Sequence, residues 1–169
     1  MERVEGDVNQ VERVEGELVF DERHFPVVIA TWVGTVTGEG IDAYYRWHDR
    51  MFDRAAREGV AVVSITDLRG ARGMVGPDLR RRFVEEADRR EAVLREQLDS
   101  VMVVARGSFV LGLVAFILCS IRPWIRLSSF DELSCGLQRA LQRLDLAGVA
   151  RPSWLEPAGY ECPVPRRAA

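Results

Sequence analysis

The stretch Val60 to Arg82 constrains the fold more than any other part of the chain. Its sequence, VAVVSITDLRGARGMVGPDLRRR, contains an apolar run over residues 60–65, a polar exit, a glycine-rich loop and the helix start Gly76-Pro77-Asp78. A short apolar run between polar flanks indicates a buried strand, and Pro followed by Asp is typical of a helix N-terminus. A strand that leads through a loop into a helix predicts an α/β protein with ligand or partner contacts at that loop.

The preceding segment predicts two further strands and an amphipathic helix. Residues 18–20 and 26–35 are apolar on both faces, as expected for strands that are covered on both sides. Residues 41–58 carry an apolar stripe at helical spacing, and Gly59 ends the predicted helix. The residues of this stripe are Ile41, Tyr44, His48, Met51, Phe52 and Ala55.

The remaining elements continue the alternation of helix and strand. We expect a helix from Pro77 to about Gln97, a strand over 101–105, an apolar helix over 109–121, a strand over 124–127 and a final helix after Phe130-Asp131. The buried stripe of the final helix is predicted to be Leu133, Leu137, Ala140, Leu141 and Leu144. This order predicts a single α/β domain with a mostly parallel sheet of about five strands, four helices and one antiparallel edge.

The two ends of the chain differ from the middle in composition. We predict a flexible, charged lead-in over residues 1–17, with an extra edge strand as the alternative, and the folded domain over 18–148. Residues 149–169 contain four prolines, which favours an extended tail. Its aromatic residues Trp154 and Tyr160 indicate that the tail is held against a surface.

Composition excludes several functional classes. The net charge is -3 and the pI is near 5.5, which argues against a nucleic-acid-binding protein. All 23 basic residues are arginine, so no lysine can form a Schiff base or serve as a P-loop lysine. We attribute this absence to codon usage in a GC-rich bacterial genome.

The cysteines and the N-terminus bear on the cellular compartment. Cys119, Cys135 and Cys162 lack CxxC spacing, and the first twenty residues are acidic without an apolar core. These features predict a cytoplasmic protein without a disulfide framework, a signal peptide or a membrane span.

The sequence assembles no recognisable catalytic or metal-binding constellation. The only histidines, His24 and His48, lie far from the cysteines, and we expect His48 to be packed and hydrogen-bonded. Ser108 and Ser120 lack a nucleophile-elbow setting, and Asp67 has no second carboxylate beside it for acid–base work. We therefore predict no metal and no cofactor.

Two stretches are candidate contact sites. Asp67, Arg69, Arg72 and Gly76 could form an anion-binding or partner-binding loop at a helix N-terminus, with a solvated connecting loop as the alternative. The helix over 109–121 is apolar on every side and too short to cross a bilayer. It is either a core helix or an interface formed by Val110, Leu113, Val114 and Ile117.

The strand–helix order and the strand that ends in Asp67-Leu68 resemble the STAS-like domains over residues 18–148. These are the sulphate-transporter and anti-sigma-factor-antagonist family, including a divergent branch related to lipid-binding CRAL-TRIO modules. In the phosphoregulated members a hydroxyl residue lies at the mouth of the second helix. The matching positions here, Val75, Gly76 and Pro77, carry no hydroxyl. Either control by phosphorylation is lost, or the register differs and Ser64 or Thr66 is the matching residue.

The resemblance implies a non-enzymatic regulatory domain that binds a protein partner or a second copy of itself. The alternative is a small-molecule or lipid-binding module with an apolar pocket beside residues 109–121. An enzyme is the third hypothesis and would require an acid–base pair that the sequence does not reveal.

Overall fold

The computed structural model describes residues 11–14, 18–72, 75–96, 99–104 and 126–163. Its centre is one six-stranded sheet in which the strands follow one another in sequence order. The strands are β1 (Val11–Val14), β2 (Leu18–Asp21), β3 (Val27–Thr35), β4 (Val63–Arg72), β5 (Asp99–Val103) and β6 (Leu127–Phe130).

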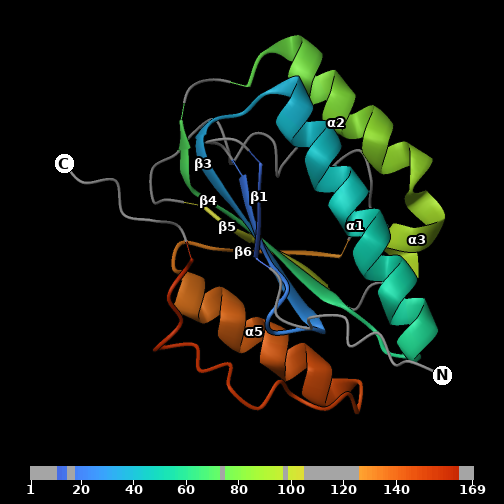
Figure 1. The fold of residues 1–169 in the computed structure, drawn as a ribbon, viewed down its shortest axis with the longest axis vertical. Helices are drawn as coiled ribbons and strands as arrows, with labels where there is room; N and C mark the ends of the chain where they lie inside the picture. Colours follow the sequence, from blue (N-terminus) through green and yellow to red (C-terminus); the bar gives the residue numbers. More distant parts are fainter. Residues whose placement is uncertain (1–10, 15–17, 73–74, 97–98, 105–125, 164–169) are drawn as a thin grey trace, which may run out of the picture.

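Strands β1, β2 and β3 pair antiparallel, whereas β3, β4, β5 and β6 pair parallel. Helices α1 (Gly38–Glu58), α2 (Pro77–Arg89) and α3 (Glu91–Glu96) lie on one side of the sheet (Figure 1). Helix α5 (Leu133–Leu146) lies on the other side (Figure 1). The predicted α/β class, the mostly parallel sheet and its antiparallel edge are confirmed.

Helix α1 supplies the core of the first layer. Thr37 caps its N-terminus by accepting a hydrogen bond from the Gly40 amide at 3.1 Å, and Gly59 ends it in the left-handed conformation. Its inner face is aromatic: Trp47 stacks on Phe20 of β2 with ring centroids 4.6 Å apart. The predicted stripe faces the sheet, where Ile41, His48, Met51 and Ala55 are buried and Tyr44 and Phe52 half-buried.

Two arginine–aspartate pairs fix α2 against α1. Arg82 donates to Asp42 and Arg90 donates to Asp49, each through two nitrogens. Arg90 also ends α2, and α3 begins at the next residue, so the predicted single helix from 77 to 97 is two helices. The sequence cannot reveal this break, because the contact that accompanies it comes from α1.

Helix α5 and the C-terminal tail (Val149–Pro163) together cover the second face of the sheet. All five predicted stripe residues of α5 are buried against β3, β4 and β5. Leu155 of the tail belongs to the same core, and Tyr160 packs against it. As its two aromatic residues predict, the tail is held to the domain: Trp154 donates to the Arg23 carbonyl at 3.1 Å and Tyr160 to Asp21 at 2.9 Å.

Several boundaries differ from the prediction, among them that of β5, which spans Asp99–Val103 rather than 101–105. The lead-in contributes the edge strand β1, which was the stated alternative for that segment. The final strand is Leu127–Phe130 rather than 124–127, because Ser100 to Val103 of β5 pair with these four residues. Strand β4 continues to Arg72, beyond the predicted end at residue 65, because β3 also extends to Thr35 and pairs with it. The apolar stretch 109–121 lies outside the described residues.

The extension of β4 depends on Gly70, where a β-carbon would lie 2.7 Å from the Trp32 carbonyl oxygen of β3. We expect Gly70→Ala to destabilise the fold by about 1–3 kcal/mol, since the obstructing atom is backbone and cannot turn aside. Gly159→Ala is the control, because its β-carbon would meet only the Glu156 side chain at 3.9 Å. Urea denaturation measures both variants, and equal stability of the two would contradict the account of β4.

Candidate functional site

The predicted anion-binding loop begins as part of the sheet. Asp67 and Arg69 both lie in β4, and Asp67 is only 3% exposed. Arg69 donates to one Asp67 carboxylate oxygen from its Nε at 2.9 Å and to the other from its Nη2 at 2.9 Å. The hydrogen bond to Asp67 raises the pKa of Arg69, so Arg69 stays charged. The structure therefore commits Arg69 to an internal partner.

The same two-residue arrangement occurs in β2. Arg23 donates to Asp21 from its backbone amide, Nε and Nη2, as Arg69 does to Asp67. Burial alone would raise the pKa of Asp21, but hydrogen bonds from Arg23 and Tyr160 outweigh it and lower that pKa. A sequence signal for this Asp–Arg lock exists, since both sites have the spacing Asp-x-Arg.

A third buried carboxylate, Asp99 of β5, binds side chains of α5 and β6. It accepts from Arg139 Nε of α5 at 3.1 Å and from the Ser128 hydroxyl of β6 at 3.3 Å. Because side chains alternate along a strand, Asp99 shares a face with Val101 and Val103, which belong to the α5 core. Asp21 and Asp67 lie on this face by the same alternation, so each of these three carboxylates has an arginine partner there.

The other members of the predicted loop lie beyond this pair. Arg72 is exposed at the end of β4, and Gly76 is the N-cap of α2 without a side-chain cap, with Pro77 at the first helical position. Residues 73 and 74 between them are outside the described part of the chain. The anion-binding or partner-binding role of Asp67, Arg69, Arg72 and Gly76 stays a prediction.

The histidines occupy different layers. His48 packs on the inner face of α1 as predicted, but the expectation that it is hydrogen-bonded is wrong: neither ring nitrogen has a partner among the described residues. His24 lies in the β2–β3 connection with its ring edge against Tyr160. Burial lowers the pKa of both, in the case of His48 to about 4. Both rings are therefore neutral near pH 7.

Within the described residues, no group of three or more His, Cys, Asp or Glu side chains could hold a metal ion. None of the helices described is long and apolar enough to cross a membrane. The interface residues predicted from sequence, Val110, Leu113, Val114 and Ile117, lie outside the described residues.

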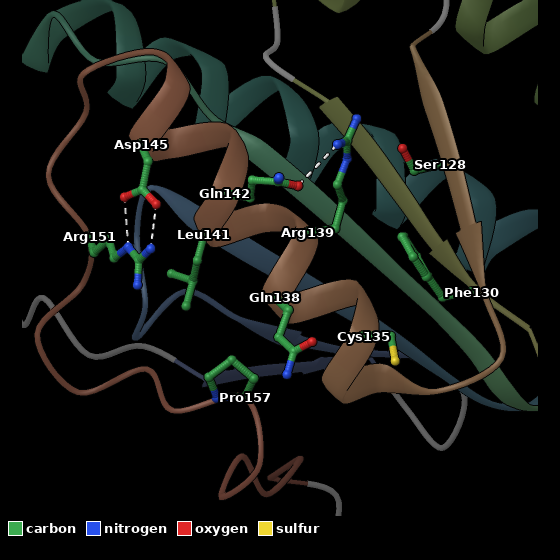
Figure 2. A pocket seen from close by; sticks show the side chains of 10 residues that line it. All are labelled: Ser128, Phe130, Cys135, Gln138, Arg139, Leu141, Gln142, Asp145, Arg151 and Pro157. Carbon is green, nitrogen blue, oxygen red and sulfur yellow. Dashed lines mark hydrogen bonds and ion pairs between the residues drawn. The ribbon is translucent and has the colours of Figure 1, made fainter.

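A groove that sequence reasoning missed runs along the outer side of α5 (Figure 2). Its volume is about 910 Å³, and α5, β6 and the tail all contribute to it. Its lining residues are Ser128, Phe130, Cys135, Gln138, Arg139, Leu141, Gln142, Asp145, Arg151 and Pro157. We call this surface the α5 groove.

The charged groups of the α5 groove are paired within the domain. Asp145 and Arg151 form an ion pair at one end, and Arg139 contacts both Asp99 and the Gln142 amide oxygen (Figure 2). The Gln138 amide has no charged partner among the residues that line the groove. A ligand of the α5 groove therefore meets hydrogen-bonding amides and apolar side chains rather than a free charge.

Two large apolar side chains that are not part of the groove lining are exposed. Leu146 is 71% exposed and continues the outer stripe of Cys135, Arg139 and Gln142 at spacings of four, three and four residues. Trp154, 58% exposed, belongs to the tail segment between Arg151 and Pro157. The stripe was visible in the sequence, but its exposure was not, because the path of the tail decides which flank of α5 is covered.

The Asp67–Arg69 pair gives a direct test of its structural role. We expect Arg69→Met to destabilise the fold by about 2–3 kcal/mol, because it leaves a buried carboxylate without its counter-ion. The matched control is Arg81→Met, whose partner Asp78 is 86% exposed, and it should cost less than about 1 kcal/mol. Urea denaturation at neutral pH measures both. An Arg69→Met protein as stable as the Arg81→Met control would rule out a structural lock.

No family model matches the chain, and no curated protein matches it. Its fold is similar to that of an uncharacterised protein of the DUF3478 family, with a SpoIIAA-like fold, from Shewanella loihica PV-4. The match has a TM-score of 0.46 and 11% identity and covers 78% of this chain and 91% of that one. That fold is STAS-like, in agreement with the resemblance seen in the sequence.

Proposed function

We propose that the chain is a non-enzymatic regulatory domain that acts by binding another protein, and that the α5 groove is the surface it uses. The observation that carries this proposal is the groove itself. Residues of β6, α5 and the tail together line one groove with a volume of about 910 Å³. Because the charged side chains in the groove already have partners within the domain, a bound protein would not have to bury a charged group of its own against them.

The shape and lining of the α5 groove favour a peptide segment over a small molecule. Small-molecule sites enclose most of their ligand behind apolar walls. This groove lies on the outer side of a helix and offers the amides of Gln138 and Gln142 together with Phe130, Leu141 and Pro157. Amides can bind the main chain of an extended, uncharged peptide segment, while the apolar residues contact its side chains.

Leu146 and Trp154 supply the apolar anchors that such a contact needs. Protein interfaces draw most of their binding energy from a few apolar or aromatic side chains that become buried. Trp154 is already held by its hydrogen bond to the Arg23 carbonyl, so a partner would not have to order that side chain.

The sequence supports a second contact surface. The helix predicted over residues 109–121 is apolar on every side, and we propose that Val110, Leu113, Val114 and Ile117 mediate homodimer or hetero-complex formation. The absence of a hydroxyl at Val75, Gly76 and Pro77 supports an interaction that phosphorylation at those positions does not control. We further propose that the protein is cytoplasmic.

A small-molecule function is the second candidate, and one observation favours it: a cavity of about 60 Å³ lies between α1 and the sheet beside His48. This volume is far below the roughly 300 Å³ at which drug-sized sites begin, so it does not suit a lipid chain. A lipid-binding function would therefore require the apolar pocket that the sequence predicts beside residues 109–121.

Photocrosslinking tests the α5 groove. A benzoylphenylalanine placed at Gln138 should capture a partner from the native lysate, and one placed at exposed Glu85 of α2 should not capture that partner. Leu146→Glu combined with Gln142→Arg should lower the yield at Gln138 at least about tenfold, because it removes an apolar anchor and an amide. Equal capture from both positions, or a yield that the double substitution leaves unchanged, would contradict the proposal.

The molecular mass of the protein in solution tests the second proposed contact surface, that of residues 109–121. Light scattering of the purified chain should show a dimer or larger assembly, and Leu113→Glu should convert it to a monomer, because a buried charge opposes association. Leu146→Glu is the matched control and should leave that assembly intact. A wild-type chain that is strictly monomeric and copurifies with no partner would count against both surfaces.

A further inference from the structure

The His48 side chain is the most unusual polar group of the described structure. It is 4% exposed, and neither of its ring nitrogens has a hydrogen-bond partner among the described residues. Aromatic rings surround it, with the Tyr44 ring centroid at 4.4 Å and the Trp47 centroid at 5.3 Å. A buried polar side chain in this state needs an explanation, because native proteins pair nearly all such groups.

A cavity of about 60 Å³ adjoins this histidine. Helix α1 contributes His48 and Tyr44, β4 contributes Thr66 and β5 contributes Ser100, while Leu94 and Met102 supply apolar wall. The Tyr44 and Thr66 hydroxyls are 2.8 Å apart and hydrogen-bond to each other. The cavity therefore has a polar side, at the histidine and the hydroxyls, and an apolar side.

The charge state of the wall limits the ligand. Among the described residues, no Asp, Glu or Arg lines the cavity. Burial lowers the pKa of His48 to about 4, against the pull of Asp49, and raises the pKa of Tyr44 to about 12. Both side chains are therefore neutral near pH 7, and an ion in the cavity would lack a counter-charge. A neutral imidazole offers one donor and one acceptor.

We propose that this cavity is a binding site for a small uncharged hydroxyl compound, whose hydroxyl group pairs with one of the unpartnered nitrogens of His48. A hydroxyl both donates and accepts, so it can pair with either the protonated or the unprotonated nitrogen of a neutral imidazole. A cavity that holds benzene measures about 150 Å³, so this one takes roughly two or three non-hydrogen atoms. Water and a short alcohol both meet these requirements, and they are distinguished by the test below.

Helices α2 and α3 each contribute one residue to the wall of the cavity. Ala87 of α2 and Leu94 of α3 close it from outside, and each is the one buried residue of its helix. Arg82 and Arg90 hold α2 to α1 by ion pairs whose carboxylates are part-exposed. The site is separate from the α5 groove, which lies on the other face of the sheet.

Nuclear magnetic resonance of the full chain tests the proposal at the ring itself. The probes are methanol and ethanol as neutral hydroxyl compounds, formate and methylammonium as charged compounds of similar size, and xenon as an apolar one. We expect methanol or ethanol to shift the His48 ring nitrogen signals saturably, or a long-lived water to show an Overhauser effect to the His48 ring protons. The first result identifies an alcohol site and the second a water site.

The variants separate a polar site from a void. His48→Phe keeps an aromatic ring and removes both nitrogens, so alcohol binding should weaken at least about tenfold. Thr66→Val keeps the shape of the wall and provides a second variant should His48→Phe fail to fold. Xenon that binds as well as methanol, saturable binding of formate, or a His48 ring with neither alcohol nor long-lived water beside it would overturn the proposal.

Discussion

The fold depends on a sheet whose central strand β3 is apolar on both faces. Val27, Ile29, Val63 and Ile65 point to one core, and Val28, Ala30 and Trp32 point to the other. Burial of apolar area is the dominant favourable term in folding, so neither face can remain in water. Every other large feature of the chain, from the aromatic face of α1 to the path of the tail, serves to cover one of these faces.

The two covers differ in kind. On one face α1 contributes a cluster of aromatic rings that includes Trp47, Tyr44 and His48, and α2 and α3 lie outside it. On the other face, the layer formed by the described residues consists of α5 and the tail, which contributes Leu155 and Tyr160. The C-terminal segment is therefore a structural part of the domain, and its aromatic hydrogen bonds to Arg23 and Asp21 fix its course.

The two proposed sites, the α5 groove and the cavity beside His48, lie on opposite faces of the sheet and differ in their chemistry. The α5 side contains the buried carboxylates, each with an arginine partner, and the α5 groove that we propose for protein contact lies outside them. Among the described residues, the core of the α1 side contains no buried carboxylate but holds a neutral histidine beside a small cavity. A surface that binds a protein and an interior that binds a small hydroxyl compound can thus exist on one domain without sharing residues.

The sequence by itself determined the elements and their order. The apolar stripes of residues 41–58 and 133–144 and the strands near 18–20 and 27–35 could be predicted, because periodicity and caps are local properties of the chain. The Asp-x-Arg spacing at residues 21–23 and 67–69 was equally visible, but its meaning as a buried lock was not.

Only the tertiary structure decided how far β4 extends, where α2 ends, which flank of α5 remains exposed and whether His48 finds a partner. Each of these depends on a residue distant in sequence: Trp32 beside Gly70, Asp49 beside Arg90, the tail beside α5, and the empty space next to His48. Hydrogen bonding and exposure are properties of neighbours in space, and the order of residues along the chain does not contain them.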